Sequence, residues 1–143
     1  MMRPGAPDWQ QPDRLPTLDA TSVHVWRAAL DQPDELVAGL AAHLSPEEEF
    51  RVCGYQRPLD RRRFILCRGL LRRLLGAYLS RPPSTIGFTL GPQGKPRLAR
   101  SAAVPDLRFN VSHSESVALF AVALGREVGV DLEHVRPLVE AET

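Results

Sequence analysis

The stretch DRRRFILCRGLLRRLLGAYL, residues 60–79, decides the fold because it holds the most regular helical pattern in the chain. Its apolar side chains recur every three or four residues, so a helix would gather them on one face. They are Phe64, Cys67, Leu70, Leu71, Leu74, Leu75 and Tyr78. Arg-Pro-Pro at 81–83 ends the pattern, since proline lacks an N–H group and disfavours a helical residue before it. We therefore expect a helix over residues 60–79.

Upstream of this helix, the sequence predicts two shorter helices and one strand. Ser45, followed by proline and by Glu48, has the spacing of a capping box, in which a serine and a glutamate satisfy the first N–H groups of a helix. Residues 36–44 carry leucine and valine at helical spacing, and SVHVWRAAL (22–30) reads as a strand. Residues 1–20 contain four prolines and few apolar side chains, so they predict a flexible N-terminal arm.

Downstream, the pattern changes to short β-branched or aromatic runs separated by turn signals. These runs are IGFTL (86–90), KPRL (95–98), LRFNVS (107–112), SVALFAVAL (116–124) and VGVDLE (128–133). The sequence therefore predicts an α+β fold in which an antiparallel sheet packs against the long helix. A length of 143 residues fits one such lobe.

The net charge of +1 does not by itself indicate a class of binding partner. Nine arginines and a single acid lie in residues 51–81, however, so any polyanion contact belongs to this block. The arginines could equally be the solvated face of an amphipathic helix. A nucleic-acid interface is less favoured, because only Phe64 lies among the arginines of residues 56–77 to stack on bases.

No apolar run approaches the roughly 20 residues that a membrane span needs, and residues 1–20 do not resemble a signal peptide. We therefore expect a cytoplasmic protein with no membrane partner. Cys53 and Cys67 lack metal-ligand spacing and predict buried free thiols of a reducing compartment.

The run VGVDLE points to a metal. As a strand, it sends Val130 and Leu132 to one face and Asp131 and Glu133 to the other. Two neighbouring carboxylates repel each other unless a cation lies between them, and oxygen ligands favour Mg²⁺, which commonly borrows phosphate oxygens as well. The alternative is an exposed strand face whose two acidic side chains are solvated and bind no metal.

The run FNVSHS (109–114) places two hydroxyls and an imidazole at the end of a predicted strand, where they could meet an anion. The alternative is a plain hairpin whose serines satisfy its backbone. A hydrolase triad of serine, His113 and Asp131 is disfavoured, because neither serine lies in a G-x-S-x-G elbow. Lys95, in GPQGKP (91–96), could reach a phosphate or point into water.

Four motifs in order resemble a known family: DRRRF (60–64), GKP (94–96), FNVSHS (109–114) and GVDLEHVRP (129–137). Together they resemble the 4′-phosphopantetheinyl transferases of the larger, surfactin-synthetase-activating type. The resemblance implies an N-terminal phosphopantetheinyl transferase lobe over residues 21–138, with 139–143 as a tail. It also implies transfer of the phosphopantetheine arm of coenzyme A to a serine of an acyl or peptidyl carrier protein, with Mg²⁺.

The resemblance also implies roles for seven residues. Asp131 and Glu133 would be the metal carboxylates. The coenzyme A phosphates would be held by Arg51, Arg63, Lys95, Ser112 and His113. Such an arrangement agrees with a displacement at phosphorus, in which positioning and neutralisation of charge do most of the catalysis. Two acids depart from the family pattern: Glu48 replaces a frequent basic residue, and Glu115 follows the SHS motif.

Family members of this type continue into a second lobe with a further glutamate and a catalytic lysine, whereas this sequence stops at VEAET. We therefore expect an incomplete N-terminal fragment in which no catalytic residue can be assigned beyond the two carboxylates. Self-association, or pairing with a C-terminal lobe, would cover the exposed face of such a fragment. The alternative is a non-catalytic remnant that binds coenzyme A or a carrier protein.

Overall fold

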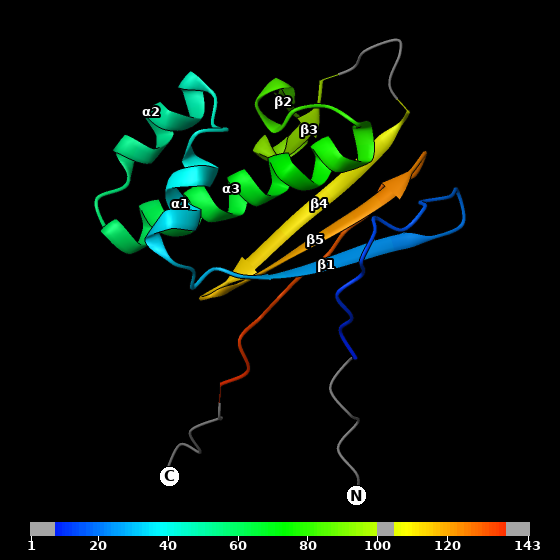
Figure 1. The fold of residues 1–143 in the computed structure, drawn as a ribbon, viewed down its shortest axis with the longest axis horizontal. Coiled ribbons are helices and arrows are strands. Elements are labelled where there is room, and N and C mark those ends of the chain that lie inside the picture. The colour runs from blue at the N-terminus through cyan, green and yellow to red at the C-terminus, as the bar shows by residue number, and fades with distance from the viewer. Residues whose placement is uncertain (1–7, 100–104, 137–143) are drawn as a thin grey trace, which may run out of the picture.

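The computed structural model describes residues 8–99 and 105–136, which form a helical layer on one face of an antiparallel sheet (Figure 1). The helices are α1 (Asp34–Ala41), α2 (Pro46–Gly54) and α3 (Pro58–Leu79). The strands are β1 (Val23–Ala29), β2 (Phe88–Leu90), β3 (Pro96–Leu98), β4 (Leu107–Ser114) and β5 (Val117–Leu124). Single 3₁₀ turns precede β2 (Pro83–Thr85) and β3 (Pro92–Gly94). The predicted α+β fold class is confirmed.

The sheet has the strand order β1-β5-β4, and both pairings are antiparallel. β4 and β5 form a hairpin in which Ser114 pairs with Val117, so only Glu115 and Ser116 make the turn. β2 and β3 form a separate short hairpin beside β4. The two hairpins thus put the segments that carry GKP and FNVSHS on neighbouring parts of the molecule.

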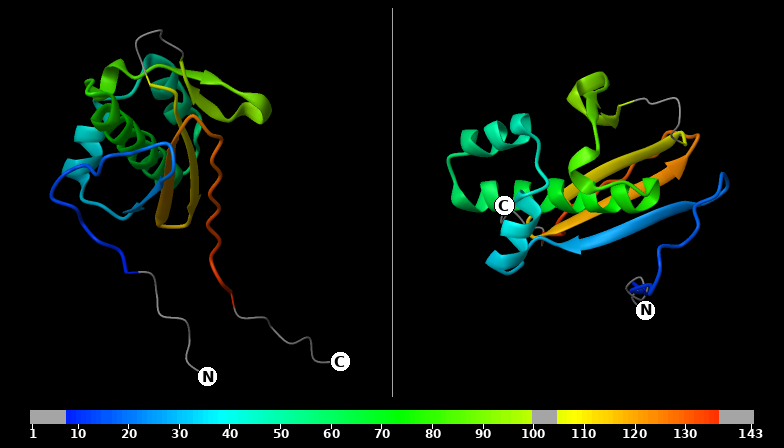
Figure 2. Two further views of the ribbon diagram at one scale, coloured as in Figure 1. Left: turned by 90° about the vertical axis from the view of Figure 1, so that its right-hand side faces the viewer. Right: turned by 45° about the horizontal axis from the view of Figure 1, so that its top comes forward.

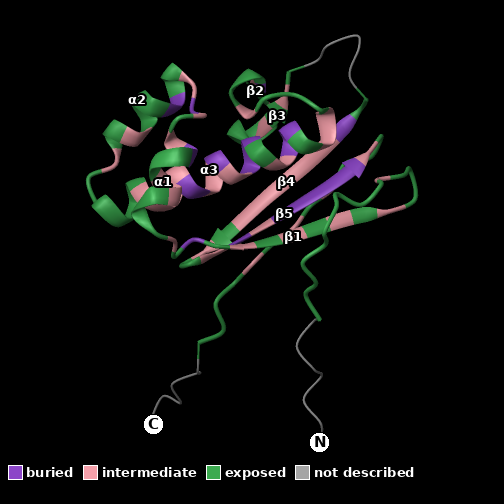
Figure 3. Ribbon diagram, viewed as in Figure 1, coloured by how far each residue is buried: buried purple, intermediate pink, exposed green. Residues whose placement is uncertain are grey.

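The core lies between α3 and the sheet, as the buried colouring of β5 and of the inner face of α3 shows (Figure 3). Its principal members are Leu40, Leu66, Leu71, Leu75, Phe120 and Val122. α1 approaches α3 closely at Gly69, where an added Cβ would lie 2.6 Å from the Cβ of Leu40. A larger side chain at this position would therefore push the two helices apart.

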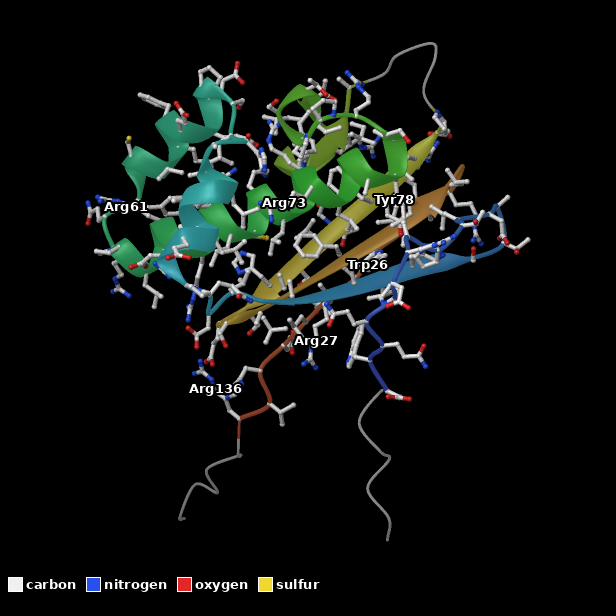
Figure 4. The ribbon with its side chains drawn as sticks, in the orientation of Figure 1. Trp26, Arg27, Arg61, Arg73, Tyr78 and Arg136 are labelled. Carbon is white, nitrogen blue, oxygen red and sulfur yellow. The ribbon has the colours of Figure 1, made fainter. Side chains whose placement is uncertain are left out.

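β1 is tied to α3 by polar side chains that face inward. The indole N–H of Trp26 donates to the hydroxyl oxygen of Tyr78 at 2.8 Å, and Nδ1 of His24 lies 2.6 Å from the same oxygen. Figure 4 shows Trp26 and Tyr78 pointing toward each other across the space between strand and helix. Burial raises the pKa of Tyr78, so the phenol stays protonated and keeps its donor.

α2 begins with the predicted capping box. The backbone N–H of Glu48 donates to Oγ of Ser45 at 3.2 Å, and the backbone N–H of Ser45 donates to Oε1 of Glu48 at 2.9 Å. Glu48 also accepts from two arginines of α3, from Arg68 at Oε2 over 2.7 Å and from Arg72 at Oε1 over 2.7 Å. The carboxylate that caps α2 therefore also joins α2 to α3.

Arg72 carries this connection further along the chain. Arg72 is 2% exposed, and its guanidinium donates to the backbone carbonyls of Pro83 and Ile86 at 3.1 and 2.8 Å. The loop that leads into β2 is thus fixed to the middle of α3. The interpretation of the α3 arginines as one solvated face is wrong for Arg68 and Arg72, although Arg61 and Arg73 are exposed.

Two other expectations need correction. Residues 128–133 are not a strand, because their backbone has no ladder partner among the residues that the structure describes. Cys53 is exposed rather than buried, since it lies on the outer side of α2; Cys67 is half-buried, and both thiols are free. Burial raises the pKa of Cys67 to about 11, so this thiol is unreactive at neutral pH.

Residues 8–20 form no helix or strand, and most of them are exposed. Leu18 nevertheless packs against the core, and the guanidinium of Arg27 lies 5.6 Å from the ring centroid of Trp9. Among the described residues, no helix is both long enough and apolar enough to span a bilayer.

Candidate coenzyme and metal site

The chain after β5 returns along the face of the sheet that α3 does not cover (Figure 2). It reverses at Gly125, whose φ of 68° lies in the left-handed region that glycine adopts without strain. We call residues 126–136 the return segment. It runs parallel to β4, because Val130 contacts Asn110 and Leu132 contacts Ser112.

Side chains of β4 hold the return segment in place of a backbone ladder. The N–H of Val130 donates to Oδ1 of Asn110 at 2.9 Å, and the N–H of Leu132 donates to Oγ of Ser112 at 3.0 Å. Arg108 lies two residues before Asn110 on the same face of β4, and its Nη1 is 2.9 Å from Oε1 of Glu127. This explains why the alternating pattern of residues 128–133 looks like a strand although no strand forms.

The alternation itself agrees with the predicted faces. Val130 and Leu132 are half-buried, whereas Asp131 and Glu133 are exposed on the other side. The hydroxyl of Ser112 lies 3.4 Å from Oδ1 of Asp131, a long and weak hydrogen bond. The structure therefore brings together one residue of FNVSHS and one of GVDLE, which are 19 positions apart.

The two acids predicted to bind Mg²⁺, Asp131 and Glu133, occupy one exposed side of the return segment. No cluster of three or more histidine, cysteine or acidic side chains suited to a metal occurs within residues 8–99 and 105–136. Mg²⁺ is commonly held by one or two carboxylates together with water and substrate phosphate oxygens. Asp131 and Glu133 fit that kind of donor set.

Ser112 and His113 do not point to the same place. β4 continues to Ser114, and successive side chains of a strand point to opposite faces. Ser112 therefore faces the return segment, whereas His113 is exposed on the side of Phe109 and Val111, which face the core.

The two predicted arginine contacts lie on α2 and on the first turns of α3. The guanidinium of Arg51 stacks over Phe64, 4.8 Å from the ring centroid, and Tyr55 contacts the same ring. Nε of Arg63 is buried and has no hydrogen-bond partner in the described part of the chain. A buried N–H without a partner is costly, so the site around Arg63 fits an acceptor such as a phosphate oxygen.

Lys95 lies on the hairpin of β2 and β3, beside a cavity of about 790 Å³. The cavity is bounded by this hairpin, by the first half of β4 and by the start of the return segment. Its polar lining includes Lys95, Arg97, Arg108, Asn110 and Glu127. Its volume is in the range of small-molecule sites.

The two departures from the family pattern have structural explanations. Glu48 is directed inward to Arg68 and Arg72 and is 6% exposed, so its carboxylate is turned away from the surface. Glu115 has a left-handed φ of 52° in the β4–β5 turn. Its carboxylate lies 3.8 Å from Nδ1 of His134 and 3.9 Å from Nη2 of Arg136 at the end of the return segment.

Comparison with known proteins decides the family. The family model described as "4′-phosphopantetheinyl transferase, N-terminal" matches residues 26–124. The chain belongs to the 4′-phosphopantetheinyl transferase family. The match runs from Trp26, within β1, to the end of β5, and it confirms at the level of the family the resemblance that the motifs predicted.

Relatives of this family come from bacteria and from animals. The chain is 43% identical over 127 residues to the 4′-phosphopantetheinyl transferase HetI of a Nostoc species, a match covering 89% of this chain and 54% of that protein. It is 42% identical over 114 residues to the putative 4′-phosphopantetheinyl transferase slr0495 of Synechocystis, covering 79% and 45%. Identity to the human L-aminoadipate-semialdehyde dehydrogenase-phosphopantetheinyl transferase is 29% over 91 residues, covering 62% and 29%. The chain therefore spans about half the length of the most similar of these proteins.

Sequence reasoning missed Asn110 and Arg108 as residues of the site. Both alternate with the core-facing residues Leu107, Phe109 and Val111, which is the available signal that their side chains share the outer face with Ser112. What the sequence does not show is the segment that returns over that face.

Proposed function

We propose that this chain forms the N-terminal lobe of a 4′-phosphopantetheinyl transferase of the larger, surfactin-synthetase-activating type, over residues 21–138. The complete enzyme would transfer the phosphopantetheine arm of coenzyme A to a serine of an acyl or peptidyl carrier protein. The observation that carries the proposal is the proximity of Ser112 to Asp131, because it joins two motifs of the family at one place on the sheet.

In this proposal, Asp131 and Glu133 hold Mg²⁺ against the coenzyme A pyrophosphate. When bound, the ion would neutralise the charge of the phosphoryl group during displacement. Arg51, Arg63, Lys95 and His113 bind and orient the phosphates. The unpartnered Nε of Arg63 supports this assignment, as does the absence of any ion pair of Arg51, Arg63 or Lys95 with a described acid. The resemblance implies the same contact for Ser112, but its hydroxyl donates toward Asp131 and accepts from the N–H of Leu132, so we do not assign Ser112 to the phosphates.

The test uses a hybrid protein in which this chain replaces the matching half of the Nostoc relative. We expect the hybrid, with Mg²⁺ and coenzyme A, to increase the mass of a carrier protein by one phosphopantetheine group in mass spectrometry. The isolated chain should give no increase, because the resemblance places the catalytic lysine in the second lobe. The matched controls are D131N and E133Q in the hybrid, which should abolish the gain.

Two outcomes would change the proposal. Transfer by the isolated chain would contradict the assignment of an essential lysine to the second lobe. Coenzyme A or carrier-protein binding by a folded hybrid that transfers nothing would favour the alternative, a non-catalytic binding module.

A further inference from the structure

We infer that Asn110, Ser112 and Arg108 are positioning residues, which fix the return segment so that Asp131 and Glu133 stay on its outer side. The contacts by which β4 holds the return segment are present in the structure itself. The consequence for metal binding rests on the function proposed above. Ser112 thereby acts through the return segment rather than as a direct ligand of a phosphate.

The first support is the matching spacing of donors and acceptors. Asn110 and Ser112 are two residues apart on one face of β4, and the N–H groups they accept from belong to residues two apart, Val130 and Leu132. Side chains on one face of a strand recur every second residue, as do the N–H groups on one side of an extended chain. A slip of the return segment by one residue would break both bonds and would turn Asp131 toward the sheet.

The second support is the limited bonding capacity of Ser112. A serine hydroxyl has one hydrogen to donate and two lone pairs that accept. Its oxygen already accepts from the N–H of Leu132, and its hydroxyl donates toward Oδ1 of Asp131 over 3.4 Å. A phosphate oxygen would need that same hydrogen, so the contacts present favour orientation of Asp131 over binding of the anion.

The third support is the charge pair at the beginning of the segment. Arg108 lies 2.9 Å from Glu127 and 3.2 Å from Asp106, so it joins the start of the return segment to the start of β4. Residues 108, 110 and 112 therefore contact the segment at three successive outward positions of β4, in the same order along the segment. The hydroxyl of Ser114, the next outward position, makes no hydrogen bond in the described part of the chain, so Ser114 offers a matched control.

The first measurement is amide hydrogen exchange of the metal-free chain, followed by nuclear magnetic resonance. We expect S112A to speed exchange at Leu132, and N110A at Val130, by roughly five- to tenfold, the factor that one hydrogen bond contributes. S112T and N110D keep an acceptor oxygen and should retain protection. S114A should change neither amide, and exchange in β5 should be the same in all variants, which shows that the sheet remains folded.

The second measurement separates positioning from phosphate binding. Calorimetry of the same variants should show that S112A weakens Mg²⁺ binding in the presence of coenzyme A by a similar factor, and that S112T restores it. Affinity for coenzyme A in EDTA should not change in S112A, whereas loss of a direct phosphate contact would lower it.

The inference is overturned if the amides of Val130 and Leu132 exchange as fast as in an unfolded peptide, or if both stay protected in the alanine variants. Lower coenzyme A affinity of S112A in EDTA would also overturn it for Ser112. If the unaltered chain with coenzyme A binds no Mg²⁺ while the exchange results hold, the proposed metal site fails and the positioning role remains.

Discussion

Ser80 ends α3 in a conformation that serine adopts at a cost. Its φ of 52° and ψ of 46° are left-handed, and the N–H of Arg81 then donates to the carbonyl of Gly76 at 2.9 Å. Glycine is the usual residue at such a helix end, because a Cβ atom is crowded in this conformation. Gly76 is needed beside it, since an added Cβ there would lie 2.6 Å from the carbonyl oxygen of Arg81.

We predict that S80G raises the free energy of unfolding by about 0.5–1 kcal/mol, because the gain from relieving the left-handed strain exceeds the entropy that glycine adds to the unfolded chain. S80A is the control, since alanine keeps the Cβ and should give no gain. Chemical denaturation of the three proteins measures the difference. Equal stabilities of S80G and S80A would show that the backbone of Ser80 is not strained.

The helices were predictable because their signals are local. The period of residues 60–79 and the capping box at Ser45 both describe neighbours within one or two turns, and α3 and α2 follow them. The roles of Glu48 and Arg72 could not be predicted, since these residues lie 24 positions apart and meet only once α2 packs on α3. The alternation of residues 128–133 predicts a strand that does not form, because alternation indicates which side chains are covered but not which groups accept hydrogen bonds from the backbone.

The carboxylate of Glu48 is the connection between α2 and α3. Burial alone would raise its pKa. The N–H of Ser45 and the guanidinium groups of Arg68 and Arg72 outweigh burial and lower the pKa below its ordinary value of 4.5. A lowered pKa means that the ionised form stabilises the fold above about pH 4.5 and that this contribution is lost as the pH falls further.

We predict that E48Q lowers the free energy of unfolding at pH 7 by roughly 3 kcal/mol, because the amide keeps the cap of α2 but leaves two arginines without their counter-charge. The difference from the unaltered protein should shrink as the pH falls below about 4.5. E47Q, on an exposed residue of the same turn, should change stability by less than about 0.5 kcal/mol. A difference that persists unchanged to pH 3 would contradict the charge-based explanation.

The candidate site draws on parts of the molecule that are distant in sequence. Arg51 comes from α2, Arg63 from α3, Lys95 from the β2–β3 hairpin, His113 from β4 and Asp131 from the return segment. A ligand that contacts all of these parts stabilises the folded state by mass action, since the unfolded chain does not bring them together.

We therefore predict that coenzyme A with Mg²⁺ raises the melting temperature of the chain, by an amount that corresponds to about 2.7 kcal/mol when the ligand is at a hundred times its Kd. EDTA should remove part of the rise, and the double variant D131N/E133Q should show only that reduced rise with or without EDTA. R63A should lower the rise in both conditions. Differential scanning fluorimetry measures each case, and an identical rise with and without EDTA in the unaltered chain would exclude the metal carboxylates.

The arrangement of Arg68 and Arg72 around Glu48 also limits how descendants of this chain can diverge. Arg68 and Arg72 share the carboxylate of Glu48 in a largely buried place, so replacing Glu48 alone would leave both guanidinium groups without a counter-charge. Replacing Arg72 alone would remove the hydrogen bonds that hold the loop before β2. We therefore expect substitutions at these three positions to occur together. Among homologues we expect the identities at 48, 68 and 72 to covary as one set, independently of the residues that meet the coenzyme.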